Sequence, residues 1–464
     1  MSQEFRIESD AIGEVQVPVE AAWMAQTQRS LQNFPTGARM PLGIIRALLN
    51  IKRAAAMANK ANGSLAADMA DAIVATIDGL LQLDDVELRK DFPLSVYQTG
   101  SGTQTNMNTN EVVAHLASEQ SGLQILPNDH VNMGQSSNDI FPTAMHIVAV
   151  EAVDNVEKSL AHLIDELRVK QDAFWETIKV GRTHLQDATP LTFGQELSGY
   201  ISALKHNQAN IDALRPQLYE LAMGGTAVGT GLNANTELGK AIAATVSEVY
   251  GFPFTAESNK FYGLANHTAM NTVHGAFKSL AADLMKIGND IRFLASGPRG
   301  GYGELSIPAN EPGSSIMPGK VNPTQVEALT MAAVRIFGND TTITMASSQG
   351  NFELNVFKPV MIDAFLESAE LMAGTMTGFA DRMIHGLDVK PARMRELLDN
   401  SLMTVTALSP HIGYHAAAEI AQAADKNGTT LKVAALESGD LTEEQYDEWM
   451  DFMAMTNLER SNKE

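Results

Sequence analysis

Apolar residues recur at helical spacing through long stretches in the middle of the chain. Between Met270 and Leu294 they follow one another at alternating intervals of three and four, without a break. This heptad pattern predicts a helix of about 25 residues, roughly 36 Å long. Four more stretches share the spacing: 153–167, 197–221, one after Pro323 and one from Pro359 to Met383. Five long helices in one chain predict an extended bundle.

The two ends of the chain differ from this middle part. Before residue 136, short helical patterns alternate with extended pieces such as Phe5–Glu8 and Gly13–Val17. After Gly350 the helical patterns become shorter, and stops are expected at Gly386, Ser409-Pro410 and Asn427-Gly428. We therefore expect a mainly α chain of three domains: an N-terminal cap domain at 1–136, a central long-helix bundle at 137–354 and a C-terminal helical domain at 355–464.

The apolar and methionine stripes are explained by core packing, which we prefer to a cofactor site. Heptads of this length also favour packing against helices from other copies of the chain. We therefore expect an oligomer.

Composition removes several classes of function. The chain has 464 residues, 55 acidic and 33 basic side chains, a formal charge of -22 and no cysteine. Without cysteine there is no disulfide, no thiolate zinc site, no thiol nucleophile and no cysteine-held iron–sulfur cluster. The negative charge argues against nucleic acid or a membrane surface as the main partner. The N-terminal residues are acidic where a targeting peptide needs basic and apolar ones, so we expect a cytoplasmic protein.

Four polar segments that contain glycine interrupt the helical patterns. Each is dense in hydroxyl, amide or basic groups, which core packing does not require. Taken singly, the first two are most simply helix caps and turns. The segments are Gly100–Asn108, Gly134–Asp139, Gly181–Pro190 and Pro312–Pro323.

The fourth segment points most clearly to a ligand. Asn322 followed by Pro323 predicts a helix N-cap with proline at the first helical position. The free N–H groups of that helix end would lie beside Lys320 and form an anion site. Glu327 falls in the first turns of the same helix, where charge–dipole attraction alone could explain it. Glycine and proline bracket Ser314 and suggest a lid.

The other motifs give less evidence for a ligand or metal site. His184 lies among hydroxyl and amide neighbours and not on an apolar stripe, which favours a functional role. His411 and His415 have the spacing of a metal pair, but no third ligand is evident, and we expect no metal site. Gly229-Thr230-Gly231 lacks the third glycine of a dinucleotide fingerprint.

These segments carry a resemblance to a known family. The run Gly-Ser-Ser-Ile-Met-Pro-Gly-Lys-Val-Asn-Pro at 313–323 resembles the signature of the fumarase/aspartase superfamily. Gly319 and the following Thr324-Gln325 resemble the iron-independent class II fumarases, whereas aspartases usually have alanine at the position of Gly319. Agreement extends over nearly the whole chain, through Ser101–Gln104, Ser136–Asp139, Thr183–Asp187, Gly224–Asn233, Asn400–Met403 and Leu441–Glu444.

The resemblance implies a fold and an activity. Members have a three-domain, mainly α fold whose central helix bundle tetramerises, with active sites shared between subunits. The implied reaction is the reversible hydration of fumarate to (S)-malate, by anti addition or elimination of water through an aci-carboxylate intermediate. No cofactor is implied. Aspartate ammonia-lyase, or another superfamily lyase releasing fumarate, stays open as an alternative, as does a binding protein on an inherited lyase fold.

The resemblance also implies roles for particular residues. Ser314 matches the lid serine thought to take the C3 proton, and His184 matches the residue assigned to the leaving hydroxyl, with Glu327 as its charge partner. The sequence does not decide which group performs which transfer. The implied substrate-binding residues are Ser101, Gly102, Thr103, Ser136, Ser137, Asn138, Thr183, Ser315, Lys320, Val321 and Asn322.

One stretch departs from the family pattern. Many members have a His-Pro-Asn-Asp stretch that forms a secondary dicarboxylate site, preceded by an arginine. Here the stretch is Leu126-Pro127-Asn128-Asp129, and Leu123 stands where the arginine would align. Asn128 and Asp129 remain as candidates for that site.

Overall fold

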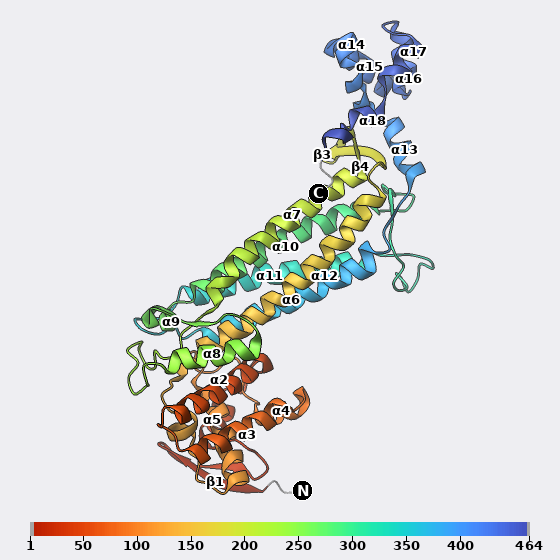
Figure 1. The fold of residues 1–464 in the computed structure, drawn as a ribbon. Coiled ribbons are helices and arrows are strands. Elements are labelled where there is room, and N and C mark those ends of the chain that lie inside the picture. The colour runs from red at the N-terminus through yellow and green to blue at the C-terminus, as the bar shows by residue number, and fades with distance from the viewer. Residues whose placement is uncertain (1–3, 462–464) are drawn as a thin grey trace. The chain divides into compact units, whose positions relative to one another are not determined.

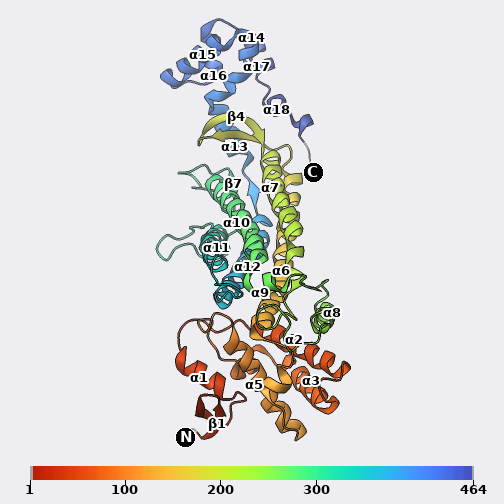
Figure 2. The same cartoon turned by 90° about the vertical axis from the view of Figure 1, so that its left-hand side faces the viewer.

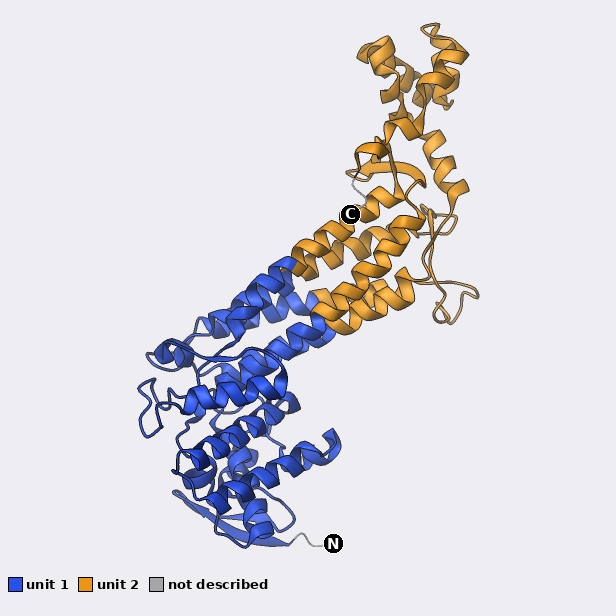
Figure 3. Ribbon diagram, in the orientation of Figure 1, with its two compact units in different colours: residues 1–156, 209–278, 334–371 blue, residues 157–208, 279–333, 372–464 orange. Residues whose placement is uncertain are grey.

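The computed structural model describes residues 4–461, and the chain divides into two compact units (Figure 3). Unit 1 takes in the chain up to Val156, together with Ala209–Lys278 and Val334–Leu371. Unit 2 takes in Glu157–Gln208, Ser279–Ala333 and the chain from Met372 on. Each unit is thus assembled from three separate segments of sequence.

Five long helices supply the bundle predicted from the heptads, and each contributes residues to both units (Figures 1 and 2). They are α6 (Ser137–Ala173), α7 (Phe193–Leu214), α10 (Thr268–Leu294), α11 (Thr324–Ser347) and α12 (Lys358–Phe379). The apolar stripe of α10 is buried throughout, from Met270 to Leu294. Burial of such a stripe, at about 25 cal/mol per Å² of apolar surface, is the main force that holds long helices together.

Polar contacts also fix the long helices in each unit. In unit 1, the buried His274 of α10 pairs with Asp340 of α11 at 3.1 Å and with Ser368 of α12 at 2.9 Å. In unit 2, Asn207 of α7 donates to Asp283 of α10 at 2.6 Å. Because a buried polar group must find its partner, these pairs fix which helix turns face each other.

The remaining elements of unit 1 are mostly short helices. The antiparallel hairpin of β1 and β2 confirms the extended pieces predicted near the N-terminus, and β5 pairs with β6 in parallel. The elements are β1 (Phe5–Asp10), β2 (Gly13–Pro18), α1 (Ala25–Asn33), α2 (Leu42–Ala61), α3 (Ala67–Leu81), α4 (Asp85–Asp91), α5 (Thr103–Ser121), the π-helix η1 (Pro127–Val131), the 3-10 helix η2 (Arg215–Leu218), β5 (Glu220–Leu221), α8 (Leu238–Tyr250), β6 (Thr255–Ala256) and α9 (Lys260–Ala265).

Unit 2 contains two small antiparallel pairs, β3 with β4 and β7 with β8, and a series of C-terminal helices with their own core around Leu408, Ile420 and Ala435. The elements are β3 (Ile178–Thr183), β4 (Gln186–Thr192), β7 (Leu305–Ser306), the π-helix η3 (Ala380–Ile384), β8 (Asp388–Val389), α13 (Pro391–Asn400), η4 (Leu402–Ala407), α14 (Ser409–Ile412), α15 (Tyr414–Asn427), α16 (Leu431–Ser438), α17 (Glu443–Trp449), α18 (Phe452–Met455) and η5 (Leu458–Arg460).

Two predicted helix ends are wrong. The stripe at 197–221 does not form one helix, because α7 ends at Leu214 and Pro216 lies in the 3-10 turn η2. Proline lacks the N–H that donates to the residue four positions before it, and its ring crowds the preceding turn, so it disfavours continuation of the helix here. Ser409-Pro410 begins α14 instead of ending a helix, which suits proline in a first turn. Over residues 4–461, no helix combines the length and apolar character needed to cross a membrane.

Candidate active site

Three of the predicted substrate-binding hydroxyls meet in unit 1. Ser101 Oγ lies 2.7 Å from Thr103 Oγ1, which in turn lies 2.7 Å from Ser137 Oγ. We call Ser101, Thr103 and Ser137 the hydroxyl cluster. Since a hydroxyl can rotate its proton, such a chain can turn its donors toward a bound anion.

Two helices begin at the hydroxyl cluster. Thr103 is the first residue of α5 and Ser137 is the first residue of α6. Gly102 precedes α5 with φ of 81°, and a Cβ there would lie 2.3 Å from the Phe141 ring, so only glycine fits. The free N–H groups and positive dipole ends of both helices favour an anion here.

Asp139 organises the start of α6. Its fully buried carboxylate accepts the backbone N–H groups of Ser136 at 3.0 Å, Gly224 at 3.0 Å and Thr226 at 2.8 Å. Burial raises the pKa of Asp139, and these three donors oppose that rise. Ser136 Oγ accepts the N–H of Asn138 at 3.2 Å, so Ser136 caps the helix, as its sequence context alone allowed.

Asn138 and Lys52 complete this region of unit 1. Asn138 Nδ2 donates to the Ala227 carbonyl at 2.8 Å. Lys52 of α2 is fully buried, and its Nζ donates to Asn132 Oδ1 at 2.7 Å and Gln135 Oε1 at 2.9 Å. Burial lowers the pKa of Lys52 well below its ordinary value, and attraction to Asp139 opposes the effect. The sequence did hold a signal for Lys52, because this lysine interrupts the buried stripe of α2.

His184 lies at the tip of the β3–β4 hairpin in unit 2. Thr183 pairs with Gln186, which leaves His184 and Leu185 as a two-residue turn, with φ of 57° and 61°. Positive φ at both positions is typical of a type I′ turn, which matches the twist of the strands. Such φ values are unfavourable for a bulky side chain such as that of Leu185, whereas histidine adopts them more readily. Thr183 and His184 are both exposed.

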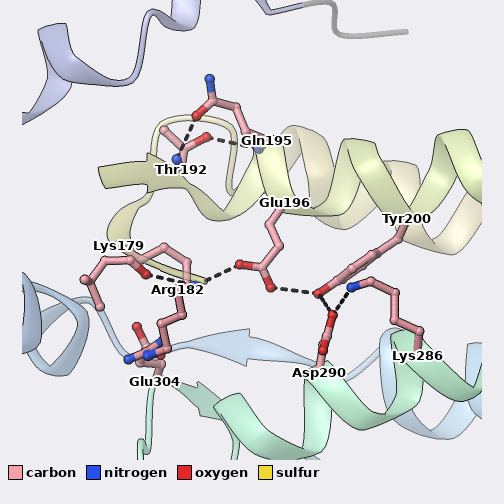
Figure 4. A network of polar contacts seen from close by, with 10 residues as sticks. Lys179, Arg182, Thr192, Gln195, Glu196, Tyr200, Lys286, Asp290 and Glu304 are labelled. Atoms are coloured by element: carbon pink, nitrogen blue, oxygen red, sulfur yellow. Dashed lines mark hydrogen bonds and ion pairs between the residues drawn. The ribbon is translucent and has the colours of Figure 1, made fainter. Parts of the chain in front are cut away.

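A buried network supports that hairpin (Figure 4). Arg182 of β3 donates to the fully buried Glu304 at 2.6 Å and lies over the Tyr302 ring at 4.3 Å. Lys179, also of β3, donates to Glu196 Oε2 at 2.8 Å. Neither residue is among those that the sequence predicts as functional. The partner of Arg182 lies 122 residues away in sequence, and the partner of Lys179 lies 17 residues away on the next helix.

The network continues along a cavity of about 730 Å³ that Thr183 also lines. Tyr200 O–H lies 2.8 Å from Glu196 Oε1 and 3.1 Å from Asp290 Oδ2, and Lys286 pairs with Asp290 (Figure 4). Burial, with the two carboxylates, raises the pKa of Tyr200. These contacts anchor the start of α7 and the hairpin to α10.

Ser314 lies in a loop of unit 2 whose two ends are joined by hydrogen bonds. We call these residues, 313–322, the 313–322 loop. Gly313 N–H donates to the Lys320 carbonyl at 3.0 Å, and Asn322 Nδ2 donates to the Gly313 carbonyl at 2.6 Å. A Cβ on Gly313 would lie 2.3 Å from the Lys320 carbonyl oxygen, so the closure requires glycine. Lys320, Ser315 and Val321 are exposed on this loop.

Ser314 Oγ itself accepts two backbone N–H groups of its own loop. The donors are Ile316 at 3.2 Å and Met317 at 3.0 Å. Hydrogen bonds to the charged form of a group lower the cost of forming that charge. The arrangement is therefore suited to a serine oxygen that becomes anionic.

The predicted cap of α11 is wrong in detail. The helix begins at Thr324, and the Pro323 carbonyl accepts its first N–H groups, from Val326 at 3.0 Å and Glu327 at 3.1 Å. The Asn322 side chain closes the 313–322 loop instead of capping the helix. Glu327 does lie in the first turn of α11, as predicted, and is exposed.

The predicted residues thus form separate groups. Unit 1 holds the hydroxyl cluster with Gly102, Ser136 and Asn138, and unit 2 holds the hairpin tip and the 313–322 loop. Over the described residues, no hydrogen bond or ion pair joins His184 to Glu327, or the hairpin tip to the 313–322 loop. The pairing of His184 with Glu327 stays a prediction.

The remaining candidates are quickly placed. Asn128 and Asp129 lie exposed in the π-helix η1 of unit 1. In the C-terminal helices of unit 2, His411 stacks on Trp449 with ring centroids 4.1 Å apart. Among residues 4–461, no group of three or more His, Asp or Glu side chains is arranged to hold a metal ion.

Comparison with known proteins covers nearly the whole chain. Residues 13–338 match a lyase family, and residues 405–457 match the family described as fumarase C C-terminus. A class II fumarate hydratase of Brucella suis is 54% identical over 452 residues, which are 95% of this chain and 96% of the relative. One of Listeria monocytogenes is 52% identical over 456 residues, or 98% and 100%.

The fold is also that of a solved relative. The crystal structure of recombinant class II fumarase from Schistosoma mansoni matches with a TM-score of 0.94 at 42% identity, covering 98% of this chain and 99% of the other.

Proposed function

Because the chain belongs to the class II fumarate hydratase family of lyases, we propose that it catalyses the reversible hydration of fumarate to (S)-malate, a step of the citric acid cycle. The family matches over nearly the whole chain support this reaction. With no cysteine in the sequence, the chain has no thiolates to hold an iron–sulfur cluster, in keeping with the iron-independent class.

The geometry of Ser314 carries the mechanism. In malate dehydration, the Ser314 alkoxide would take the proton from C3, leaving an aci-carboxylate dianion. The C2–O bond then breaks, and the hydroxyl leaves as water with a proton from His184, directly or through water. The two N–H groups on Ser314 Oγ support its role as the base, since they stabilise the alkoxide. Hydration runs the same steps in reverse.

Other residues would hold the substrate dianion. In this proposal Lys320, Asn322 and backbone N–H groups of the 313–322 loop stabilise the dianion, with Ser315 and Val321 lining the site. The hydroxyl cluster, Gly102, Ser136, Asn138 and Thr183 fix the carboxylates, and Glu327 of another subunit pairs with His184. On a chain of charge -22, an anion can bind only where such groups reverse the local potential. Asn128 and Asp129 are proposed as remnants of a secondary dicarboxylate site.

We propose that the enzyme is a homotetramer whose active sites combine residues of several subunits. Val334 and Met345, on the same face of α11, are 63% and 58% exposed, and such apolar positions favour packing against another copy. The three-domain division at 1–136, 137–354 and 355–464 and a cytoplasmic setting also belong to this proposal. Size measurement in solution and cell fractionation test the oligomer and the location.

The reaction is tested with chelator-treated protein. Addition of malate should produce fumarate, seen as rising ultraviolet absorbance, while aspartate should give none. Activity with aspartate alone would instead identify an ammonia-lyase.

The base is tested with Ser314→Ala. Its turnover should fall by about 10²-fold to 10⁴-fold, the usual contribution of a positioned base. Ser438→Ala, a change in the C-terminal helices, serves as the control. It should keep normal turnover and the same molecular mass in solution as the wild type. Near-normal turnover in Ser314→Ala would remove Ser314 from the base role.

A further inference from the structure

Lys358, the first residue of α12, is a buried cation without a partner. Its side chain is fully buried, and within residues 4–461 its Nζ has no hydrogen-bond partner. Burial of an unpaired ammonium group is costly, so a chain retains one only where something compensates. Lys52, the other buried lysine of unit 1, differs because two side-chain oxygens accept from it.

The backbone of Lys358 lies against the segment that leads into the hydroxyl cluster. Lys358 N–H donates to the Gly100 carbonyl at 3.1 Å, and Ser101 follows Gly100 directly. A Cβ on Gly100 would lie 1.3 Å from the Val356 carbonyl oxygen, so the two strands of backbone are in direct contact. The start of α12 thus joins the starts of α5 and α6 beside the hydroxyl cluster, and all three positive helix ends meet there.

The charges around Lys358 do not balance within the chain. Asp139 of α6 attracts both Lys358 and Lys52 of α2, but its carboxylate already accepts three backbone N–H groups. His267, before α10, is also buried, and Lys358 helps to lower its pKa, so it stays neutral. Lys260 of α9 is also attracted to Asp139, but it has Glu257 and Glu220 as partners of its own. Two fully buried lysines, Lys52 and Lys358, are therefore left with one carboxylate. Burial lowers the pKa of Lys358 to about 7.

We propose that the Lys358 ammonium is the counter-charge for a substrate carboxylate bound at the hydroxyl cluster, acting through space from the core and not by contact. It is a positioning residue for a four-carbon dicarboxylate. The inference rests on the proposed function, because it takes the hydroxyl cluster as the place where that anion binds.

Two consequences distinguish this role from a structural one. A bound anion stabilises the ammonium form of Lys358, so dicarboxylate binding above neutral pH takes up a proton. Asp139, Lys52 and His267 face the same region and stay in place in a Lys358 variant, although the loss of the Lys358 charge lets the pKa of His267 rise. A difference in proton uptake between the two proteins therefore reports on the removal of Lys358. Removal of the unpaired charge should also leave the fold as stable as before or more stable.

The experiment compares Lys358→Met with the wild-type enzyme, using succinate as an unreactive dicarboxylate probe. In Lys358→Met, the Kd for succinate and the KM for malate should rise roughly tenfold, as expected for losing one charge across several ångströms of protein. The kcat should change much less, and Tm should not fall. Calorimetry above neutral pH, in buffers of different ionisation enthalpy, should show a larger proton uptake with succinate in the wild type than in Lys358→Met. Lys60→Met, an exposed lysine of α2, is the matched control and should behave as wild type.

Unchanged Kd and KM in Lys358→Met would overturn the inference. The inference would also be overturned if Tm falls while kcat falls by about the same factor by which KM rises, because that pattern marks a purely structural residue. If the wild type fails to interconvert malate and fumarate, yet succinate binding depends on Lys358, the proposed function falls and the counter-charge stands.

Discussion

His184 and Leu185 both adopt positive φ although neither is glycine, and this turn directs the proposed acid. A non-glycine residue in this left-handed region costs about 1–2 kcal/mol. Strain of that kind persists where the surroundings determine the conformation, here through the ion pair of Arg182 with Glu304 and the ladder from Thr183 to Gln186. The strained turn thus lowers the stability of the hairpin and fixes the orientation of the His184 imidazole.

We expect Leu185→Asn to stabilise the protein by about 0.5–1 kcal/mol, because asparagine tolerates positive φ far better than leucine and Leu185 is exposed. Leu185→Val is the matched contrast and should destabilise it, since a β-branched side chain resists that conformation. Thermal unfolding of both variants checks the pair. The reverse order of Tm values would show that Leu185 is held by packing instead.

Sequence could reveal some site residues and not others. Ser101, Ser137, His184 and Ser314 stand in dense local motifs, so their chemistry is visible in a few letters. Lys358 is different, because its burial and its lack of a partner arise from segments some 90 to 260 residues away, at His267, Asp139 and Gly100. No local pattern records a charge balance made by tertiary contacts.

At the scale of elements, His274, Asp340 and Ser368 have the connectivity of a catalytic triad but not its setting. Ser368 is fully buried and donates to the Ala364 carbonyl at 2.8 Å, so it is no nucleophile facing a substrate. The three residues instead join α10, α11 and α12 at one level of unit 1. The heptad spacing of apolar residues predicted these long helices. It did not predict the end of α7, which depends on Pro216, because the spacing of apolar residues takes no account of proline.

Buried neutral histidines make the stability of unit 1 sensitive to acid. Burial lowers the pKa of both His267 and His274 from the ordinary 6.5. The unfolded chain therefore binds protons below about pH 6.5 that the folded chain does not, and each such histidine removes about 1.4 kcal/mol per pH unit as pH falls further. Stability should be lower at pH 5 than at pH 7.5.

His267→Phe isolates one of these groups, because neither ring nitrogen of His267 has a partner among the described residues. The variant should show a shallower fall of Tm with acidification than the wild type. An identical slope would mean that His267 titrates normally in the folded chain.

At the scale of the whole molecule, the proposed site residues are divided between two units of one chain. The hydroxyl cluster belongs to unit 1, and Ser314 and His184 belong to unit 2. Heptads in the sequence favoured association with other copies, and the motifs identified the family. Neither says which copy contributes which group, because the sequence of one chain contains no information on its symmetry.

Hybrid tetramers test the shared site directly. Ser137→Ala and Ser314→Ala should each be nearly inactive alone, yet their co-expression should restore activity in about a quarter of the sites if the two serines of a site come from different chains and mix at random. Activity assays on the mixed tetramer, purified through two different tags, measure this. Failure to recover activity would place both serines of a site on one chain.

The 313–322 loop carries both donors to Ser314 Oγ within itself, and its ends are closed by Gly313, Lys320 and Asn322. The hydrogen bonds to Ser314 Oγ therefore do not depend on any other part of the protein. If the loop moves as a rigid piece, these hydrogen bonds are kept. The reactivity of Ser314 is thus set within its own loop, and only the position of this serine relative to the substrate depends on the rest of the enzyme.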